Sequence, residues 1–241
     1  MIRLFVSCDL TASAEVSASA DQSHYLAHVM RVRIGEPILL FNGRDGEWAA
    51  KVTSHGRNET RLAISHRVRP QSNSPDLELL VALVKRGRLE TIVEKASELG
   101  VRRVRLLVTA RTDVSRASIK RLNAIAVEAA EQTGRLDGLE IGAPLKLAEV
   151  LAAWPEERAL MFCDEAGDAP PALQALSTAT DGPWAILIGP EGGFTPQERA
   201  AARAVSGVVP VSLGPRILRA DTAVIAALSL WQAARGDWRG A

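Results

Sequence analysis

The chain has 241 residues, which is enough for one large domain or two small ones. Its composition, with 47% hydrophobic and 24% charged residues, is ordinary for a globular protein with a sizeable core. The 29 basic and 28 acidic residues leave a net charge of +1, which alone gives no indication of nucleic-acid binding. No stretch reaches the ~18 apolar residues of a membrane span, and the N-terminus lacks the long apolar run of a signal peptide, so we expect a cytoplasmic protein.

The first 70 residues carry the signals of a small β-rich domain. We expect a strand over Met1–Ser7, a short helix at about Ser23–Met30, a hairpin over residues 34–52 and an alternating strand over Thr60–Val68. The polar segment 70–75 is bounded by prolines and is typical of a linker. We therefore predict one domain over residues 1–70 and a second over residues 71–241.

The second domain begins with a change of pattern. Leu77–Val84 is a nearly continuous apolar run, as in a buried parallel strand. A helix stopped by Gly100, a strand over Val101–Thr109, a helix over Ile119–Thr133 and a strand over Leu160–Cys163 follow. Strands that alternate with helices predict an α/β domain with a mostly parallel sheet.

Two glycine loops then follow two further strands. The run Ile186–Ile188 ends in the loop Gly189–Gly193, and Thr195, Pro196 and Glu198 form the capping-box start of a helix. The strand-like segment Val208–Leu213 leads into a second loop, residues 214–222, before another apolar helix. In open α/β sheets, ligands bind at the carboxyl ends of strands, so this layout predicts a small-molecule pocket made by two loops.

The sequence lacks two common nucleotide-binding motifs, which limits the kinds of ligand that the loops can bind. There is no GxxxxGK[ST] phosphate loop, and no GxGxxG follows an early strand. Two tight strand-to-helix turns that hold no ligand remain the alternative at this point.

Five motifs in chain order resemble the RsmE family of 16S ribosomal RNA uridine N3-methyltransferases, within the SPOUT superfamily. The matching segments cover nearly the whole chain and are residues 24–43, 85–101, 131–135, 188–194 and 213–219. The resemblance implies a PUA-like RNA-binding β-barrel followed by a SPOUT methyltransferase domain with a C-terminal trefoil knot. It also implies S-adenosylmethionine as cofactor, a homodimer, and 16S rRNA or the small ribosomal subunit as partner, with no membrane and no metal.

The cofactor-binding residues that we expect lie in the two loops. Aliphatic side chains can pack against the faces of adenine, and the backbone groups of glycines can hold it. Packing in the protein core is the alternative role of the aliphatic residues. The predicted set is Ile188, Gly189, Pro190, Glu191, Gly192, Gly193, Leu213, Gly214, Ile217, Leu218, Arg219, Thr222 and Ala223.

Arg219 and Asp221 are the candidate catalytic residues. Methylation at N3 of uracil requires loss of a proton, and an arginine can stabilise the resulting negative charge on the ring. Asp221 could orient Arg219 or accept the proton, but an Arg219–Asp221 ion pair or a helix-capping role for Asp221 is also open. Asp221 stands where the family usually has glutamate.

Basic residues outside the loops are the candidate RNA contacts. The predicted RNA-binding set is Arg31, Arg33, Lys85, Arg86, Arg88, Arg111, Gln132 and Arg135. The target uridine must be single-stranded or flipped out, because base pairing hides N3. His24 and His28 have no visible third ligand, and Cys8 and Cys163 lie in no zinc-ligand spacing, so we expect no metal.

Two rival functions remain open from the sequence. One is a non-catalytic RNA-binding ribosome-assembly factor with the same fold, which would lack cofactor affinity or methyl transfer. The other is a phosphate- or nucleotide-binding enzyme, against which the missing phosphate-loop and dinucleotide fingerprints count.

Overall fold

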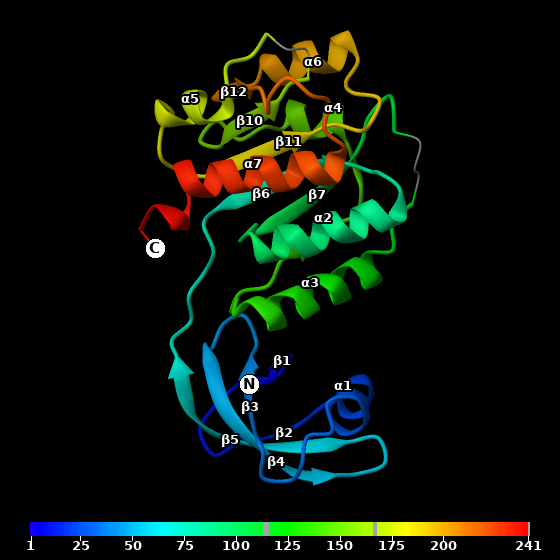
Figure 1. Ribbon diagram of the computed structural model, residues 1–241, viewed down its shortest axis with the longest axis vertical. Helices are drawn as coiled ribbons and strands as arrows, with labels where there is room; N and C mark the ends of the chain where they lie inside the picture. Colours follow the sequence, from blue (N-terminus) through cyan, green and yellow to red (C-terminus); the bar gives the residue numbers. More distant parts are fainter. Residues whose placement is uncertain (113–115, 166–167, 241) are drawn as a thin grey trace. The chain divides into compact units, whose positions relative to one another are not determined.

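A computed structural model describes residues 1–112, 116–165 and 168–240 of the chain (Figure 1). Its contacts divide the chain into two compact units. Unit 1 comprises Met1–Asn73 together with Ala130–Gly138, and unit 2 comprises Ser74–Ala129 together with Leu139–Ala241. Unit 1 is therefore built from two separate stretches of sequence.

Unit 1 is a small, curled sheet with the strand order β1-β3-β4-β5-β2. Only the pair β1 and β3 is parallel, and the other pairs are antiparallel. Apolar side chains from the strands and from Leu26 form its core. The elements are β1 (Arg3–Phe5), β2 (Glu15–Ser17), α1 (Ala20–His24), a π-helical turn (Tyr25–Val29), β3 (Pro37–Phe41), β4 (Glu47–His55) and β5 (Thr60–Arg69).

The second stretch of unit 1 is held by a buried ion pair. Glu47, only 3% exposed, accepts hydrogen bonds from Arg3 at 2.7 Å and from Arg69 at 2.8 Å. Arg3 also donates to backbone carbonyls of Glu131 and Arg135, and Arg69 donates to that of Gly134. The two guanidinium groups thereby bind carbonyl groups in the last turn of helix α3 (Ile119–Thr133) and carbonyl groups of the residues that follow the helix.

Unit 2 is built on a sheet in which every strand pair is parallel. The strand order is β12-β10-β11-β6-β7-β8, and β9 also pairs with β7. Its elements, besides α3, are β6 (Leu77–Ala82), α2 (Arg86–Glu98), β7 (Arg103–Val108), β8 (Glu140–Ile141), β9 (Leu145–Lys146), α4 (Leu147–Ala152), β10 (Ala159–Cys163), α5 (Ala172–Ser177), β11 (Trp184–Ile188), α6 (Pro196–Arg203), β12 (Val208–Val211), α7 (Ala220–Ala234) and the 3-10 turn Asp237–Gly240.

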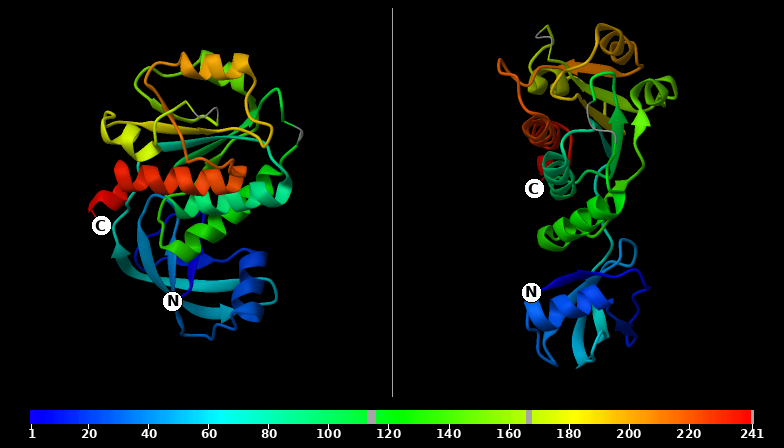
Figure 2. Two further views of the ribbon diagram at one scale, coloured as in Figure 1. Left: turned by 45° about the horizontal axis from the view of Figure 1, so that its top comes forward. Right: turned by 90° about the vertical axis from the view of Figure 1, so that its right-hand side faces the viewer.

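Helices cover both faces of this sheet (Figure 2). Buried side chains of α2, α3, α5 and α7 share one core with one face of the strands. Side chains of α4 and α6 share a second core with the other face. Because both faces are covered, all six residues of β6 are buried, which explains the continuous apolar run Leu77–Val84 in the sequence.

The expected fold class is confirmed as a parallel α/β sheet preceded by a small curled β-sheet. The capping box is also present as predicted, because the Thr195 side chain accepts from the Glu198 N–H while Glu198 accepts from the Thr195 N–H. The expected helix at Ser23–Met30 is shifted, since α1 begins at Ala20 and continues as a π-helical turn to Val29. Helices α4 and α5 were not predicted, because six residues are too few to show a helical period.

Candidate functional site

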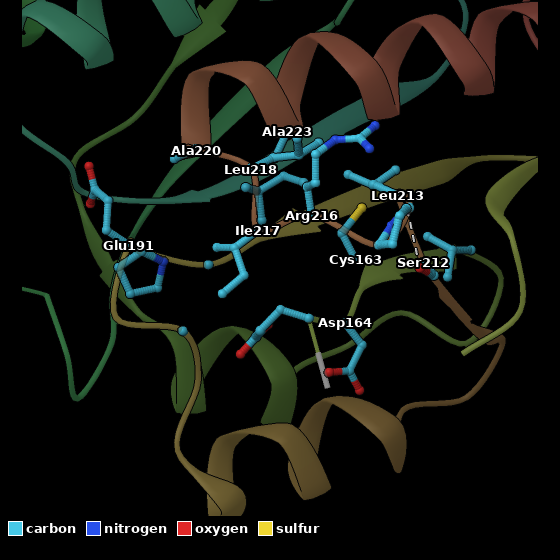
Figure 3. Close-up of a pocket in the computed structure, with 18 residues that line it drawn as sticks. Cys163, Asp164, Glu191, Ser212, Leu213, Arg216, Ile217, Leu218, Ala220 and Ala223 are labelled. Carbon is cyan, nitrogen blue, oxygen red and sulfur yellow. Dashed lines mark hydrogen bonds between the residues drawn. The ribbon is translucent and has the colours of Figure 1, made fainter. Parts of the chain in front are cut away.

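Unit 2 contains a cavity of about 200 Å³ at the carboxyl ends of three neighbouring strands (Figure 3). Strand β10 lies between β11 and β12, and all three run in the same direction. The loops that leave these strands therefore meet at one edge of the sheet, where α/β proteins bind ligands.

Most of the predicted cofactor-binding residues line this cavity. They are Ile188, Gly189, Pro190, Glu191, Gly193, Leu213, Gly214, Ile217, Leu218 and Ala223. Gly192, Arg219 and Thr222 are not among the lining residues. The two loops, separate in the sequence, thus form one site.

The first loop is fixed by close packing at its glycines. A Cβ on Gly189 would lie 2.8 Å from the ring of Phe194, and one on Gly193 would lie 2.4 Å from Oε1 of Glu165. Gly193 also has a φ of +67°, and its N–H donates to the carbonyl of Pro190 at 2.9 Å. Only glycine fits at these two positions without a shift of the surroundings.

Three charged side chains brace the same loop from outside. Arg111 donates to the carbonyl of Gly192 at 2.6 Å, and Arg88 forms an ion pair with Glu191. Glu165 accepts the N–H of Phe194 at 3.1 Å. The shape of the loop is therefore set before any ligand arrives.

A third segment, Cys163-Asp164-Glu165 at the end of β10, also lines the cavity. The Asp164 side chain is fully buried and pairs with Arg199 at 3.0 Å and with Arg203 at 2.7 Å. In Figure 3 its carboxylate points toward α6, away from the apolar side chains in the middle of the site. Burial raises the pKa of the Cys163 thiol, so this sulfur stays protonated and is a poor nucleophile.

The second loop supplies the exposed apolar wall. Ile217 is 89% exposed, although it belongs to the cavity lining. Leu213 and Leu218 are partly buried and pack against the main core, as does the buried Ile188. Gly214 has a φ of +109° and open space where a Cβ would lie. The lining therefore combines accessible aliphatic surface with accessible backbone.

The candidate catalytic residues lie where this loop enters α7. Arg219 is exposed at the N-cap position, and no hydrogen bond or ion pair joins its side chain to Asp221 or to other residues that the structure describes. Oδ1 of Asp221 is buried without a hydrogen-bond partner in the described ranges. Asp221 does not cap the helix, since no side-chain capping bond is formed there.

The candidate RNA contacts fall into two groups. Arg31, Arg33, Lys85 and Gln132 are exposed. Arg86 pairs with Glu90, Arg88 with Glu191 and Arg135 with Asp137, while Arg111 holds the Gly192 carbonyl. The Arg135 side chain is only 6% exposed, so it supports the fold of unit 1 in this state.

Several lining residues were missed from the sequence. They are Cys163, Asp164, Glu165, Val211, Ser212, Pro215, Arg216 and Ala220. The signal for the first three was present, because Asp164 and Glu165 directly follow a predicted strand of the parallel sheet. What the sequence did not show is that β10 lies between the two strands that carry the glycine loops.

No group of three or more His, Cys, Asp or Glu side chains among the described residues could hold a metal ion. None of the helices described is long and apolar enough to cross a membrane.

Comparisons with known proteins agree with this architecture. Residues 71–232 match the family described as RNA methyltransferase domain, and residues 19–64 match the RNA methyltransferase PUA domain. Ribosomal RNA small subunit methyltransferase E from Synechocystis is 34% identical over 94% of this chain and 76% of its own length. The protein of the same name from Rickettsia conorii is 27% identical over 94% of this chain and 93% of its own length.

A solved structure extends the similarity to the fold. Ribosomal RNA small subunit methyltransferase E from Neisseria gonorrhoeae, bound to S-adenosyl methionine, superposes with a TM-score of 0.86. The two chains are 28% identical, and the match covers 99% of each. With a methyltransferase profile across most of unit 2 and relatives of one name along nearly the whole chain, this protein belongs to the RNA methyltransferase family that includes ribosomal RNA small subunit methyltransferase E.

Proposed function

We propose that this protein transfers a methyl group from S-adenosylmethionine to N3 of a uridine in 16S rRNA of the small ribosomal subunit. The observation that carries the proposal is the cavity at the carboxyl ends of β10, β11 and β12, lined by both glycine loops. Family membership supports the reaction type, and the S-adenosyl methionine in the Neisseria relative supports the cofactor.

The lining of the cavity suits an adenosine-type ligand. Ile217, Leu218 and Leu213 offer aliphatic surface for a flat base, and Ile217 in particular is 89% exposed. Gly189 and Gly214 leave backbone groups open to a ligand. We propose that these residues, with Ile188, Pro190, Gly193 and Ala223, hold the cofactor.

S-adenosylmethionine, when bound, supplies a methyl group activated by an adjacent sulfonium. The protein has to align the nucleophile with that methyl group and exclude competing positions. The rigid first loop, braced by Phe194 and Glu165, serves this alignment. The thiol of Cys163, held neutral by burial, does not compete as an acceptor.

Arg219 and Asp221 act on the base in this proposal. Uracil N3 loses its proton, and the guanidinium of Arg219 stabilises the negative charge that spreads over O2 and O4. Arg219 is exposed and its guanidinium has no intramolecular partner in the described parts of the chain, so the guanidinium is available to substrate. The buried, unpartnered Oδ1 of Asp221 is an acceptor for the proton or for a guanidinium hydrogen.

The deciding experiment is methyl transfer from labelled S-adenosylmethionine to unmodified small ribosomal subunits, followed by nucleoside mass analysis. Label recovered as 3-methyluridine would establish donor, acceptor and atom together. Cofactor binding without transfer would favour the rival function, a non-catalytic assembly factor. Neither binding nor transfer would remove the methyltransferase proposal.

Four further features belong to the proposal. An RNA-binding domain extends over residues 1–70 and a methyltransferase domain over residues 71–241, although residues 130–138 pack with unit 1. The protein works in the cytoplasm, where ribosomes are assembled. Two copies form a homodimer, which sedimentation equilibrium tests. The chain around β10–α7 forms a trefoil knot, and single-molecule stretching tests this because a knotted chain extends less than ~3.5 Å per residue.

A further inference from the structure

Unit 1 has a cluster of exposed apolar and basic side chains that do not pack into its core. Val29, Met30 and Ile34 are 59%, 43% and 65% exposed. Arg31 and Arg33, also exposed, lie between Met30 and Ile34 in the chain. We call residues 29–34 the knuckle; it follows α1 and the π-helical turn (Figure 1).

Hydrogen bonds hold the backbone of the knuckle in place. Val32 in its middle is 6% exposed, its N–H donates to the Leu26 carbonyl at 2.9 Å, and its carbonyl lies 2.8 Å from Nε2 of His55. At the end of the knuckle, the Gly35 N–H donates to Val52 on β4 at 2.8 Å. These bonds fix the side chains on either side of Val32 in an outward position.

The backbone at Arg31 is also strained. Its φ of +53° lies in the left-handed region, which costs a non-glycine residue conformational energy. Strain of this kind persists where the surrounding structure enforces it, and it occurs often at binding sites.

The charges of the knuckle complement a polyanion. Neither guanidinium, of Arg31 or of Arg33, has a hydrogen bond or ion pair with the residues that the structure describes. The nearest acid in sequence, Glu36, is engaged through its carboxylate with the N–H of Arg33 at 3.0 Å. Lys51 is exposed on β4, in register with Pro37, and adds a third cation beside the knuckle.

We propose that the knuckle binds an unpaired segment of the rRNA substrate, with its aliphatic side chains against base faces and its arginines against phosphates. Two cationic side chains lie here between apolar ones, so that one surface can contact both the bases and the phosphates of a single strand. The identification of the RNA rests on the proposed function. The apolar contact of Val29, Met30 and Ile34 goes beyond that function. It makes the knuckle a binding site for unstacked bases and not only a basic patch.

The test compares serine variants of two exposed aliphatic residues of unit 1. Met30→Ser and Ile34→Ser remove apolar contact without touching the cavity in unit 2. Val68→Ser is the matched control, since Val68 lies on β5 of the same unit and is 47% exposed. The measurements are the Kd for a labelled single-stranded oligouridylate, the KM and kcat for small ribosomal subunits, and the Kd for S-adenosylmethionine.

We expect each knuckle variant to raise the Kd for the oligouridylate and the KM for subunits by up to about tenfold, because each serine removes apolar area that the RNA would bury. The control should equal the parent protein, and kcat and the cofactor Kd should not change. Salt titration adds a second readout. Arg31→Ala and Arg33→Ala should each reduce the slope of log Kd against log salt by about one, whereas Met30→Ser should leave the slope unchanged.

Other results overturn the proposal. If Met30→Ser and Ile34→Ser bind RNA like the parent but dissociate a dimer in sedimentation, the knuckle covers a second copy of the chain. If they bind RNA like Val68→Ser and stay unchanged in size, it has no role in RNA binding. Failure of the proposed function looks different, because then the parent protein forms no 3-methyluridine whether or not the knuckle variants lose RNA binding.

Discussion

The ring of Phe194 lies directly against the backbone of Gly189, in the space that a side chain at this position would need. A Cβ on Gly189 would be 2.8 Å from Cε2 of Phe194. The ring itself is 2% exposed and packs edge-on against Phe162, with centroids 5.4 Å apart. Two positions five residues apart in the sequence therefore decide together how the first loop leaves β11.

Gly189→Ala should distort this loop. Because Phe194 is enclosed, the added methyl group must move either the ring or the loop, at a cost of about 1–3 kcal/mol in the free energy of unfolding. We expect cofactor affinity to fall at least tenfold, measured by calorimetry with S-adenosylmethionine. Gly142→Ala is the control, because a Cβ there would have no neighbour within 4 Å. Equal affinities in the two variants would show that the loop is not part of the cofactor site.

Arg219→Ala should separate binding from chemistry. The side chain is exposed, makes no contact that supports α7 and does not line the cavity, so cofactor affinity and stability should stay near the parent values. Loss of one stabilising group for the developing charge lowers kcat about 10²- to 10³-fold. Single-turnover methyl transfer measures this, and Arg219→Lys, which keeps the charge, should retain part of the rate. A fall in cofactor affinity with normal turnover at saturation would place Arg219 in the cofactor site instead.

Glu47→Ala should destabilise unit 1. The variant leaves Arg3, whose side chain is only 9% exposed, without its carboxylate, and loss of one partner of a buried pair costs about 3–5 kcal/mol. Urea unfolding followed by circular dichroism measures the loss. Glu156→Ala, at an exposed position, is the control and should unfold like the parent. A cost below about 1 kcal/mol would mean that the pair acts as an ordinary surface ion pair.

The same carboxylate predicts a pH dependence of stability. Burial alone raises the pKa of Glu47, but hydrogen bonds from Arg69 and Arg3 outweigh it and hold the pKa below its ordinary value. A lowered pKa in the folded state means that the stabilisation is complete above the ordinary glutamate pKa of about 4.3. It is lost as the pH falls through the lower pKa of the folded protein. The difference in unfolding free energy between parent and Glu47→Gln should therefore shrink below about pH 4.

Thr195→Ala should weaken the start of α6. The Thr195 hydroxyl accepts the Glu198 N–H at 3.2 Å, and loss of such a cap costs about 1 kcal/mol. Thermal unfolding of Thr195→Ala, Glu198→Ala and the double variant measures the coupling. We expect the double variant to lose less than the sum of the single losses, since the two side chains cap each other. Strict additivity would mean that the two contacts act independently.

Local sequence patterns predicted the parts of the site that are local in structure. The glycine loops and the Thr195 cap depend on neighbours within a few residues, and their positions were predicted from the sequence. The placement of β10 between β11 and β12 depends on pairing between distant segments, so the sequence did not reveal Asp164 and Glu165 at the cavity. Arg135 was expected to contact RNA, whereas its guanidinium binds the carboxylate of Asp137, two residues later. The exposure of Val29, Met30 and Ile34 was not predicted either, because apolar residues next to a helix are more often part of a core.

The divided sequence of unit 1 has a consequence for how the chain folds as it is synthesised. Strands β1 to β5 leave the ribosome first, but Arg3 and Arg69 find their carbonyl partners only at residues 130–138. Until then Arg3 and Arg69 can pair with Glu47 only, because the residues that carry the carbonyl groups have not been synthesised. Unit 1 is thus completed only after about a third of unit 2 has been translated. A ribosome stalled before Gly138 would therefore carry an incomplete sheet that a protease can cleave. A fragment that ends at the linker should behave in the same way.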